Sequence, residues 1–253
     1  MKIIKDYRPG GKSVNELPRS NISEFKKLNQ VIERLVTKVE NDFINLKQFT
    51  ENASHEIQTP LAIIKTKSEI LLQREELDEE VVKEIISIND GATKLSKLDQ
   101  ALLQLMKIEN HQYPESEKID LSGLLEKKLQ RLNELIEMKN IKLKTSININ
   151  VFINMNVSLA DIMLSNFLNN AIKHNIFGEE LIIKLIPKEL SIKNTGEALH
   201  IEPEKLLDRF VKESTSNESI GLGLSLVKQI CETYNFTVSY NYEHSLHELK
   251  INF

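Results

Sequence analysis

His55 lies in a segment whose side chains could carry out nucleophilic chemistry, residues 49–61, FTENASHEIQTPL. An imidazole nitrogen can attack when a neighbouring base holds or removes the proton of the other nitrogen, and Glu56 is adjacent. Thr59 follows one helical turn later, so its hydroxyl lies on the same face and could position a water. Pro60 lacks a backbone donor and is expected to bend a helix at this point. A solvent-facing histidine on a helix is more often only a polar surface residue. Whether His55 is a nucleophile therefore depends on the other motifs of the chain.

A second group of polar side chains lies at residues 166–175, NFLNNAIKHN. On a helix its apolar residues share one side, and the opposite polar side is formed by Asn166, Asn170, Lys173 and His174. An Asn carbonyl oxygen is a suitable ligand for Mg²⁺, and a Lys ammonium suits phosphate charge. The simpler interpretation is the solvated face of an amphipathic helix. Because Asn is a poor helix former, the cluster of asparagines favours a function.

The segment IKNTGEAL, residues 192–199, could receive a nucleotide base. The Asn194 side chain could accept a hydrogen bond from the adenine amino group. Gly196 would let the backbone approach the flat ring closely. Taken alone, an Asn-Thr-Gly sequence is an ordinary turn, and its position between the other segments is what suggests a site.

Residues 207–223 have the composition of a mobile lid followed by a phosphate-binding turn. In LDRFVK, Phe210 is the candidate anchor, and the polar run from Lys212 to Ser219 could close over a nucleotide. The following IGLGLSLVKQI places Gly221 and Gly223 where main-chain amides could face phosphate oxygens at the positive end of a helix. A lone Gly-x-Gly is more often a turn.

Two amphipathic helices are expected to present the histidine. Apolar residues recur at spacings of three and four over residues 25–53, interrupted by Asp42, and at heptad spacing over residues 85–106, interrupted by Asp99. With an acidic turn near residues 75–80 these helices make a hairpin. Such a hairpin has too little facing surface to bury its apolar seams alone, so we predict a homodimer that forms a four-helix bundle.

The heptad pattern also predicts where the imidazole points. If Ala53 occupies the apolar seam, His55 lies two positions further on and faces water, where a second domain could reach it. For heptads without other features, a purely structural coiled coil would be the better interpretation.

The second half of the chain mixes helices and strands. Proline and polar residues at 111–118 predict a linker. Beyond it the pattern predicts helices at 121–139, 159–172 and 222–234, an alternating stretch at 141–149, and strands at 181–186, 190–192, 236–242 and 249–253. Helices that can cover one face of a sheet imply an α+β layer sandwich.

Composition excludes several other classes. Lys and Arg number 33 against 37 Asp and Glu, for a net charge of -4, and no block of like charge is present, so nucleic acid is not an expected partner. The single cysteine, Cys231, is expected to be a small apolar core residue. No stretch approaches the roughly 20 apolar residues that span a bilayer, so the chain as given is expected to be soluble.

These segments, in this order and spacing, closely resemble the H, N, F and glycine boxes of two-component sensor histidine kinases. The resemblance implies that His55 is the phosphoacceptor, that Glu56 is its base and that Thr59 helps remove phosphate from the partner protein. It implies Asn166 as the Mg²⁺ ligand and an ATP site formed by Asn170, Lys173, His174, Asn194, Gly196, Lys212, Gly221, Leu222, Gly223 and Leu224.

The sequence departs from the family pattern at four positions. Gln58 replaces an Arg that often precedes the Thr, on what is expected to be an exposed face. Asn194 stands in place of Asp, which keeps an acceptor oxygen and loses the charge. Ala198 and Ser219 stand where the glycine boxes usually have Gly.

The resemblance also implies a domain order and a function. We expect a lead-in or linker at 1–20, a coiled-coil helix similar to a HAMP module at 21–48, the dimerisation and phosphotransfer hairpin at 49–112, and a Bergerat-type ATP-binding sandwich at 119–253. The implied activity is that of an ATP:protein-histidine phosphotransferase, with ATP and Mg²⁺, that passes the phosphate to the aspartate of a response-regulator receiver domain and also dephosphorylates that regulator. It implies the cytoplasmic portion of a sensor that meets the membrane only through a segment upstream of this chain.

Two alternatives remain at this point. One is a nucleotide-gated dimeric signalling module without phosphotransfer, which the departures at Asn194, Ala198 and Ser219 favour. The other is a coiled-coil scaffold joined to an unrelated α+β domain. The presence of His55 and Asn166 argues against both.

Overall fold

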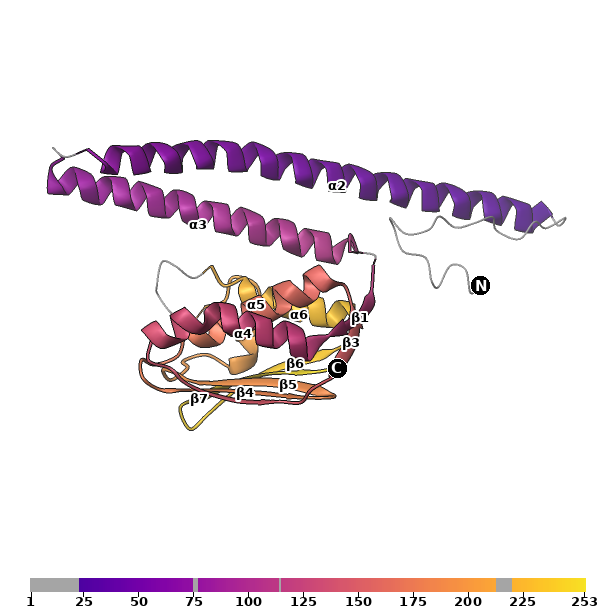
Figure 1. Ribbon diagram of the computed structural model, residues 1–253. Coiled ribbons are helices and arrows are strands. Elements are labelled where there is room, and N and C mark those ends of the chain that lie inside the picture. Colours follow the sequence, from indigo (N-terminus) through magenta and orange to yellow (C-terminus); the bar gives the residue numbers. More distant parts are fainter. Residues whose placement is uncertain (1–22, 75–76, 114, 213–219) are drawn as a thin grey trace. The chain divides into compact units, whose positions relative to one another are not determined.

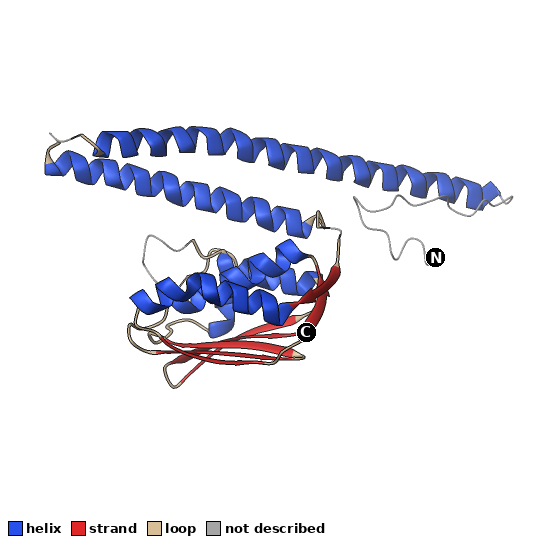
Figure 2. Cartoon of the chain, viewed as in Figure 1, coloured by secondary structure: helices blue, strands red, loops and turns tan. Residues whose placement is uncertain are grey.

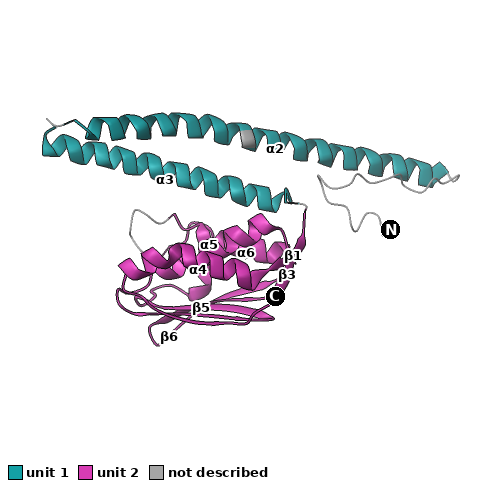
Figure 3. Ribbon diagram, in the orientation of Figure 1, with its two compact units in different colours: residues 1–114 teal, residues 115–253 magenta. Residues whose placement is uncertain are grey.

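The computed structural model describes residues 23–74, 77–113, 115–212 and 220–253, and the chain divides into two compact units, Met1–Pro114 and Glu115–Phe253 (Figure 3). The first unit is helical and the second contains all of the described strands (Figure 1). The predicted lead-in at 1–20 and the run from 213 to 219, which includes Ser219, lie outside the described residues. The predicted domain boundaries stay a prediction.

The helical unit is a hairpin of two long helices, α2 (Ser23–Leu72) and α3 (Glu79–Glu109). Asp78 precedes α3, and its side chain accepts a hydrogen bond from the Glu80 amide at 3.5 Å, which helps to fix where the helix begins. The helix α2 is continuous through Pro60. Side-chain contacts join α2 to α3, which confirms the predicted helical hairpin.

The contact between α2 and α3 contains more hydroxyl groups than the heptad pattern predicts. The buried residues of α2 in this region recur at spacings of four and seven and are Thr50, Ser54, Leu61 and Ser68. The hydroxyls of Thr50 and Ser68 donate back to carbonyls of their own helix, at 2.7 and 2.9 Å, which satisfies them without a partner across the hairpin. Ala53, predicted for the seam, is only half-buried, because the contact is centred on Ser54.

Several residues predicted for the apolar seams are instead exposed on the single hairpin. In α3 these residues are seven positions apart, and Ile88, Leu95 and Leu102 remain 55%, 53% and 37% exposed. In α2 the exposed positions that fit one heptad register are Leu28, Leu35, Phe49, Ile63 and Ile70. The two helices bury one stripe against each other and leave a second apolar stripe uncovered within the hairpin.

The second unit is an α+β sandwich, as predicted. Its five-stranded sheet has the order β2-β4-β5-β7-β6, in which β2 and β4 are parallel and the other neighbours are antiparallel. The strands are β2 (Lys142–Ile147), β4 (Glu180–Ile186), β5 (Glu189–Thr195), β6 (Thr237–Glu243) and β7 (Leu246–Asn252). The helices α4 (Leu121–Met138), α5 (Val157–Lys173) and α6 (Gly223–Thr233) cover one face (Figures 1 and 2).

The core between the helices and the sheet is apolar and fully enclosed. In α5, Phe167 and Leu168 are fully buried, as are Leu181 and Ile183 in β4. The alternation of buried and exposed residues along β4 places the apolar side chains on the helix-covered face. Cys231 is fully buried in α6. Burial is the main cause that raises the pKa of its thiol to about 12, and the charge of the nearby Glu232 adds to it. Such a thiol fits an inert core residue.

Two short strands and a 3-10 helix were not predicted from the sequence. The strands β1 (Glu117–Asp120) and β3 (Phe152–Met155) pair antiparallel, and η1 (Pro203–Leu207) precedes the predicted lid. The linker predicted at 111–118 therefore ends in a strand. A strand of four residues shows too few alternations to be distinguished from a loop. Among the described helices, none combines the length and the apolar character needed to cross a membrane.

Candidate functional site

His55 and Glu56 are both exposed on α2, as the heptad pattern predicts for His55. The Thr59 hydroxyl donates to the His55 carbonyl oxygen at 3.0 Å. This bond uses the hydroxyl hydrogen and leaves the oxygen lone pairs able to accept from a water. The backbone therefore places Thr59 one turn after His55 with its oxygen available on the exposed surface of the helix.

Gln58 is not on a fully exposed face, contrary to the prediction. Its side-chain amide donates to one carboxylate oxygen of Asp99 at 3.1 Å, and the Ser54 hydroxyl donates to the other oxygen at 3.2 Å. Asp99 belongs to α3, so both bonds cross the hairpin. They tie the residue before His55 and the residue three positions after it to a single carboxylate.

Asn166 and Gly223 bring α5 and the start of α6 together. The Asn166 amide nitrogen donates to the Ile162 carbonyl at 2.9 Å. A Cβ atom added to Gly223 would lie 2.9 Å from the Asn166 carboxamide oxygen, closer than such atoms approach. The oxygen of Asn166 therefore faces the first residue of α6, and a side chain at Gly223 would displace it from this position. An amide oxygen at a helix N-terminus is a suitable Mg²⁺ ligand next to phosphates.

The end of α5 gathers basic side chains. Lys173 is the last helical residue and His174 the C-cap, and both are exposed. The ammonium of Lys139 donates to the carbonyls of Ile172 and Lys173, each at 2.9 Å. A cation at a helix C-terminus satisfies carbonyls that lack helical partners.

The pKa of His174 is lowered from its usual value. Although His174 is reached by solvent, desolvation of its ring by the surrounding atoms is the largest cause. The charges of Lys173 and Lys139 act in the same direction, as would that of His247 if its ring were protonated, whereas Glu197 opposes them. His174 is therefore held in its neutral form at pH 7, in which one ring nitrogen can still accept a hydrogen bond.

The segment that carries Asn194 and Gly196 runs beside the end of α5. Asn194 is buried, and its side-chain nitrogen lies 3.3 Å from the Thr195 carbonyl, so the amide donates there and leaves its oxygen as the acceptor. The Ile176 amide donates to the same carbonyl at 3.0 Å, which fastens the end of β5 to the residues after α5. The predicted strand ended at residue 192, before Asn194. In the structure β5 continues to Thr195, so Asn194 lies inside the strand.

The base of the predicted lid is closed by backbone contacts. Gly221 has φ +75, and a Cβ there would lie 2.7 Å from the Val211 carbonyl, so glycine is required. The Phe210 amide donates to the Gly221 carbonyl at 2.9 Å. Both ends of the 212–220 segment are therefore held together. Lys212 is exposed just beyond this closure, and no described contact places it with the other predicted residues.

Leu222 and Leu224 support this turn from inside. Leu222 is buried at the N-cap position of α6 and Leu224 is buried in its first turn. The side chain of the N-cap residue makes no hydrogen bond to the first backbone amides of α6. An exposed ion pair of 3.0 Å between Lys228 and Asp208 joins α6 to the segment before the lid.

Four positions that contact or adjoin the predicted site residues were assigned no role from the sequence. Asp99 was treated as an interruption of the heptads, and Lys139 as the end of a helix. Asn175 was counted with the N segment, but it is buried, and its amide nitrogen lies 3.4 Å from the Glu179 carbonyl. His247 is buried in β7, whose predicted start at residue 249 was three residues late. The alternation of His247, Leu249 and Ile251 was the signal that could have found it.

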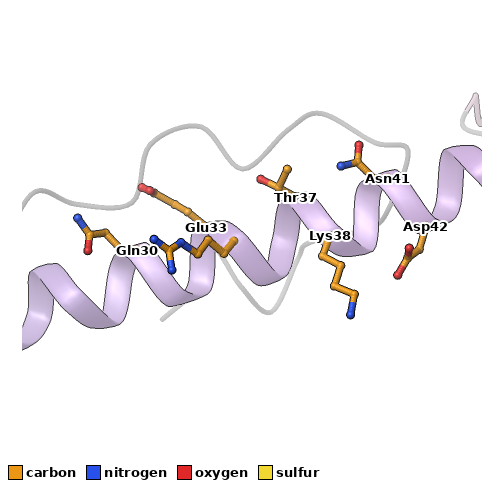
Figure 4. Close-up of a pocket in the computed structure, with 7 residues that line it drawn as sticks. Gln30, Glu33, Thr37, Lys38, Asn41 and Asp42 are labelled. Carbon is orange, nitrogen blue, oxygen red and sulfur yellow. The ribbon is translucent and has the colours of Figure 1, made fainter.

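A cavity of about 600 Å³ lies along α2 but contains none of the predicted site residues. Its lining residues recur at helical spacing on one polar face and are Gln30, Glu33, Arg34, Thr37, Lys38, Asn41 and Asp42 (Figure 4). These side chains form a polar, open face of α2, and none of them lies among the predicted site residues.

Comparison with known protein families assigns both units. The His Kinase A (phospho-acceptor) domain matches residues 45–111. The histidine kinase-, DNA gyrase B-, and HSP90-like ATPase domain matches residues 156–249. The first match contains His55, and the second contains Asn166, Asn194 and both glycines of the phosphate-binding turn.

Individual relatives agree with these matches. The sensor histidine kinase HprS of Escherichia coli strain K12 is 29% identical over 90% of this chain and 51% of its own length. The signal transduction histidine-protein kinase ArlS of Staphylococcus haemolyticus is 27% identical over 92% of this chain and 53% of its own length. The chain thus spans about half the length of these relatives.

Solved structures show the same fold. The crystal structure of full-length ShkA in complex with AMPPNP superimposes with a TM-score of 0.62 at 20% identity, over 81% of this chain and 45% of that one. The histidine kinase AdeS of Acinetobacter baumannii gives a TM-score of 0.55 at 21% identity, over 78% of this chain and 96% of that one.

Proposed function

Because the chain belongs to the two-component sensor histidine kinases, we propose that it transfers the γ-phosphoryl group of ATP to His55. The observation that carries this proposal is the presence, in one chain, of an exposed imidazole in a phosphoacceptor domain and an ATPase-type domain in which Asn166 faces the glycine turn.

In the proposed reaction a nitrogen of His55 attacks the γ-phosphorus in line. A nitrogen–phosphorus bond forms as the bond from the γ-phosphorus to the β–γ bridging oxygen breaks, and ADP leaves with the bond electrons. Glu56 holds or accepts the proton of the other ring nitrogen. Both side chains are exposed, so the second unit can approach them without unfolding of the hairpin.

The nucleotide is held by residues of β5, of the loop that follows it and of the turn that begins α6. Asn194 accepts a hydrogen bond from the adenine amino group, and Gly196 gives the base access to the backbone. The amides of Gly221 and Gly223 face the phosphates at the start of α6.

Asn166 is the proposed protein ligand for Mg²⁺. The described residues contain no group of three His, Cys, Asp or Glu side chains able to hold a metal. A Mg²⁺ ion bound through one amide oxygen would take further ligands from phosphate oxygens and water. The ion neutralises negative charge on the phosphate oxygens. Asn170, Lys173 and His174 line the same helix toward its C-terminal end, where Lys173 can pair with phosphate and the neutral His174 can hydrogen-bond.

The proposal includes a homodimer. A second copy would cover the exposed heptad stripes of α2 and α3, including Ile63 and Ile70 on one helix and Ile88 and Leu95 on the other. Apolar stripes of this length favour burial in a four-helix bundle.

A receiver domain is the proposed acceptor of the phosphate from His55. Thr59 would orient a water that hydrolyses the phosphate on that partner. Since ATP is supplied by the cytoplasm, we place the reaction there. A nucleotide-gated module without transfer remains the second candidate, favoured by Ala198 in the first glycine segment.

Incubation of the chain with γ-labelled ATP and Mg²⁺, followed by acid or base, tests the proposal. Phosphohistidine is acid-labile and base-stable, so label that survives base and is lost in acid supports transfer to histidine. Binding of nucleotide without any label would favour the second candidate.

A further inference from the structure

His247 lies at the end of the inner face of the sheet, next to the proposed base site. Residues of β5 and β7 face each other in register, and the pairs along the helix-covered side are Leu190 with Ile251, Ile192 with Leu249, and Asn194 with His247. The first two pairs are apolar and buried. The third pair is polar and equally buried, although an apolar pair would extend the core at lower cost.

The imidazole of His247 holds a backbone carbonyl of the loop that follows β5. Its Nε2 lies 2.9 Å from the Glu197 carbonyl oxygen, and its Nδ1 lies 3.0 Å from the Tyr240 hydroxyl. A carbonyl can only accept, so Nε2 carries the hydrogen. In the neutral ring Nδ1 then accepts from Tyr240, and this bond fixes the tautomer that holds the loop.

The ring also determines how closely the loop can approach the sheet. A Cβ added to Gly196 would lie 2.3 Å from Cδ2 and 2.4 Å from Nε2 of His247, so the loop backbone rests directly on the imidazole. Tyr242, the partner of His247 on β6, packs against the ring with 4.7 Å between ring centroids. Gly196 is thus confined between His247 and the His174 carbonyl, which would lie 3.3 Å from such a Cβ.

We propose that His247 is a positioning residue for nucleotide binding, which acts by holding the Gly196–Glu197 backbone in the shape that receives the base. The inference rests on the proposed nucleotide site. His247 acts through the loop rather than through the ligand. The bond to the Glu197 carbonyl restrains the backbone next to Ala198, which replaces the usual glycine.

Two substitutions separate the loop contact from simple packing. In His247→Gln the side-chain amide reaches about as far as Nε2 and can donate to the Glu197 carbonyl. In His247→Asn the amide reaches only about as far as Nδ1, so it retains the Tyr240 side and loses the loop. Both variants remove the aromatic ring and leave a neutral polar group, and they differ by one methylene, whose effect on packing the unfolding temperature reports.

The test is calorimetric titration of the full chain with ADP, together with the thermal unfolding temperature. We expect His247→Asn to weaken ADP binding about 5-fold to 10-fold, as for loss of one neutral hydrogen bond, and His247→Gln to stay within about 2-fold of the wild type. Leu249→Ala, two residues along the same face, is the control and should lower the unfolding temperature while ADP affinity is kept.

Equal affinity of the Gln and Asn variants would overturn the inference, and so would affinities that follow the unfolding temperature across all three variants. If the wild-type chain itself binds no ADP, the proposed nucleotide function fails instead. The two failures are therefore distinguishable.

Discussion

The side-chain amide of Gln58 donates to a carboxylate oxygen of Asp99 at 3.1 Å, joining the helix that carries His55 to the second helix of the hairpin. Each of these residues departs from its sequence pattern, since Gln58 replaces a family Arg and Asp99 interrupts a heptad. The contact supplies one of the donors that the carboxylate of Asp99 requires from the facing helix. Ser54, buried beside His55, supplies the second donor.

Asp99→Ala is expected to destabilise the hairpin by about 1 to 3 kcal/mol, because it leaves the partly buried donors of Ser54 and Gln58 without their acceptor. Urea unfolding at one fixed protein concentration measures this, since dimerisation contributes to the apparent stability. Asp90→Ala, an exposed position on the same helix, is the control for helix propensity. Equal effects of both substitutions would show that the carboxylate of Asp99 is not a structural acceptor.

Gly223→Ala is expected to lower autophosphorylation about tenfold or more without lowering the unfolding temperature. The new methyl group would approach the Asn166 oxygen to 2.9 Å, and the flexible side chain can rotate away at little cost to the fold. Rotation removes the oxygen from its place beside the phosphate-binding turn. Gly91→Ala in α3, where a Cβ meets open space, should leave labelling unchanged. Normal labelling of the Gly223 variant would dissociate Asn166 from Mg²⁺ binding.

Asn194→Leu is expected to weaken ATP binding by roughly 5-fold to 150-fold, because the adenine amino group loses an acceptor in a buried setting. Asn194→Asp should bind ATP at least as well as the wild type, since a charged acceptor strengthens the bond. Calorimetric titration measures both, and Ser191→Ala on the opposite face of β5 is the control. GTP should bind more weakly than ATP, unless the amide of Asn194 turns to present its nitrogen. Unchanged ATP affinity in the Leu variant would remove Asn194 from the base site.

Thr59→Ala is expected to slow dephosphorylation of a receiver domain roughly tenfold or more, with a smaller effect on the labelling of His55. The hydroxyl can orient a water, whereas attack on ATP does not require it. The measurement is the loss of label from a receiver domain that the chain itself has phosphorylated. Thr66→Ala, exposed on the same helix, should change neither rate. Equal losses of both activities at Thr59 would indicate a structural role for its bond to the His55 carbonyl.

The sequence predicted the fold where a pattern extends over many residues. The heptads of α2 and α3 and the alternation in β4 were sufficient for the hairpin and the sandwich. The four-residue strands β1 and β3 are stabilised by pairing with each other across more than 30 residues of chain, and no local pattern indicates that pairing.

The site was predicted less completely than the fold. Residues that match a family box, such as His55 and Asn166, were identified from the sequence. Residues that support them from other elements, such as Asp99 and His247, were not, because their role depends on contacts across the hairpin or the sheet. The sequence pattern also could not show that the heptad residues Ile88 and Leu95 are exposed. Residues that pack within one hairpin and residues that are left for a second copy follow the same heptad spacing.

The most direct test of the account compares His55→Gln with His111→Asn after incubation with γ-labelled ATP and Mg²⁺. His111 is an exposed imidazole that follows the end of α3, with φ 50, a conformation that Asn accepts. We expect that His55→Gln abolishes the acid-labile, base-stable label while ATP binding and dimerisation are kept, and that His111→Asn is labelled as the wild type. Label retained on the His55 variant, at the rate of the wild type, would contradict the assignment of His55 as the phosphoacceptor.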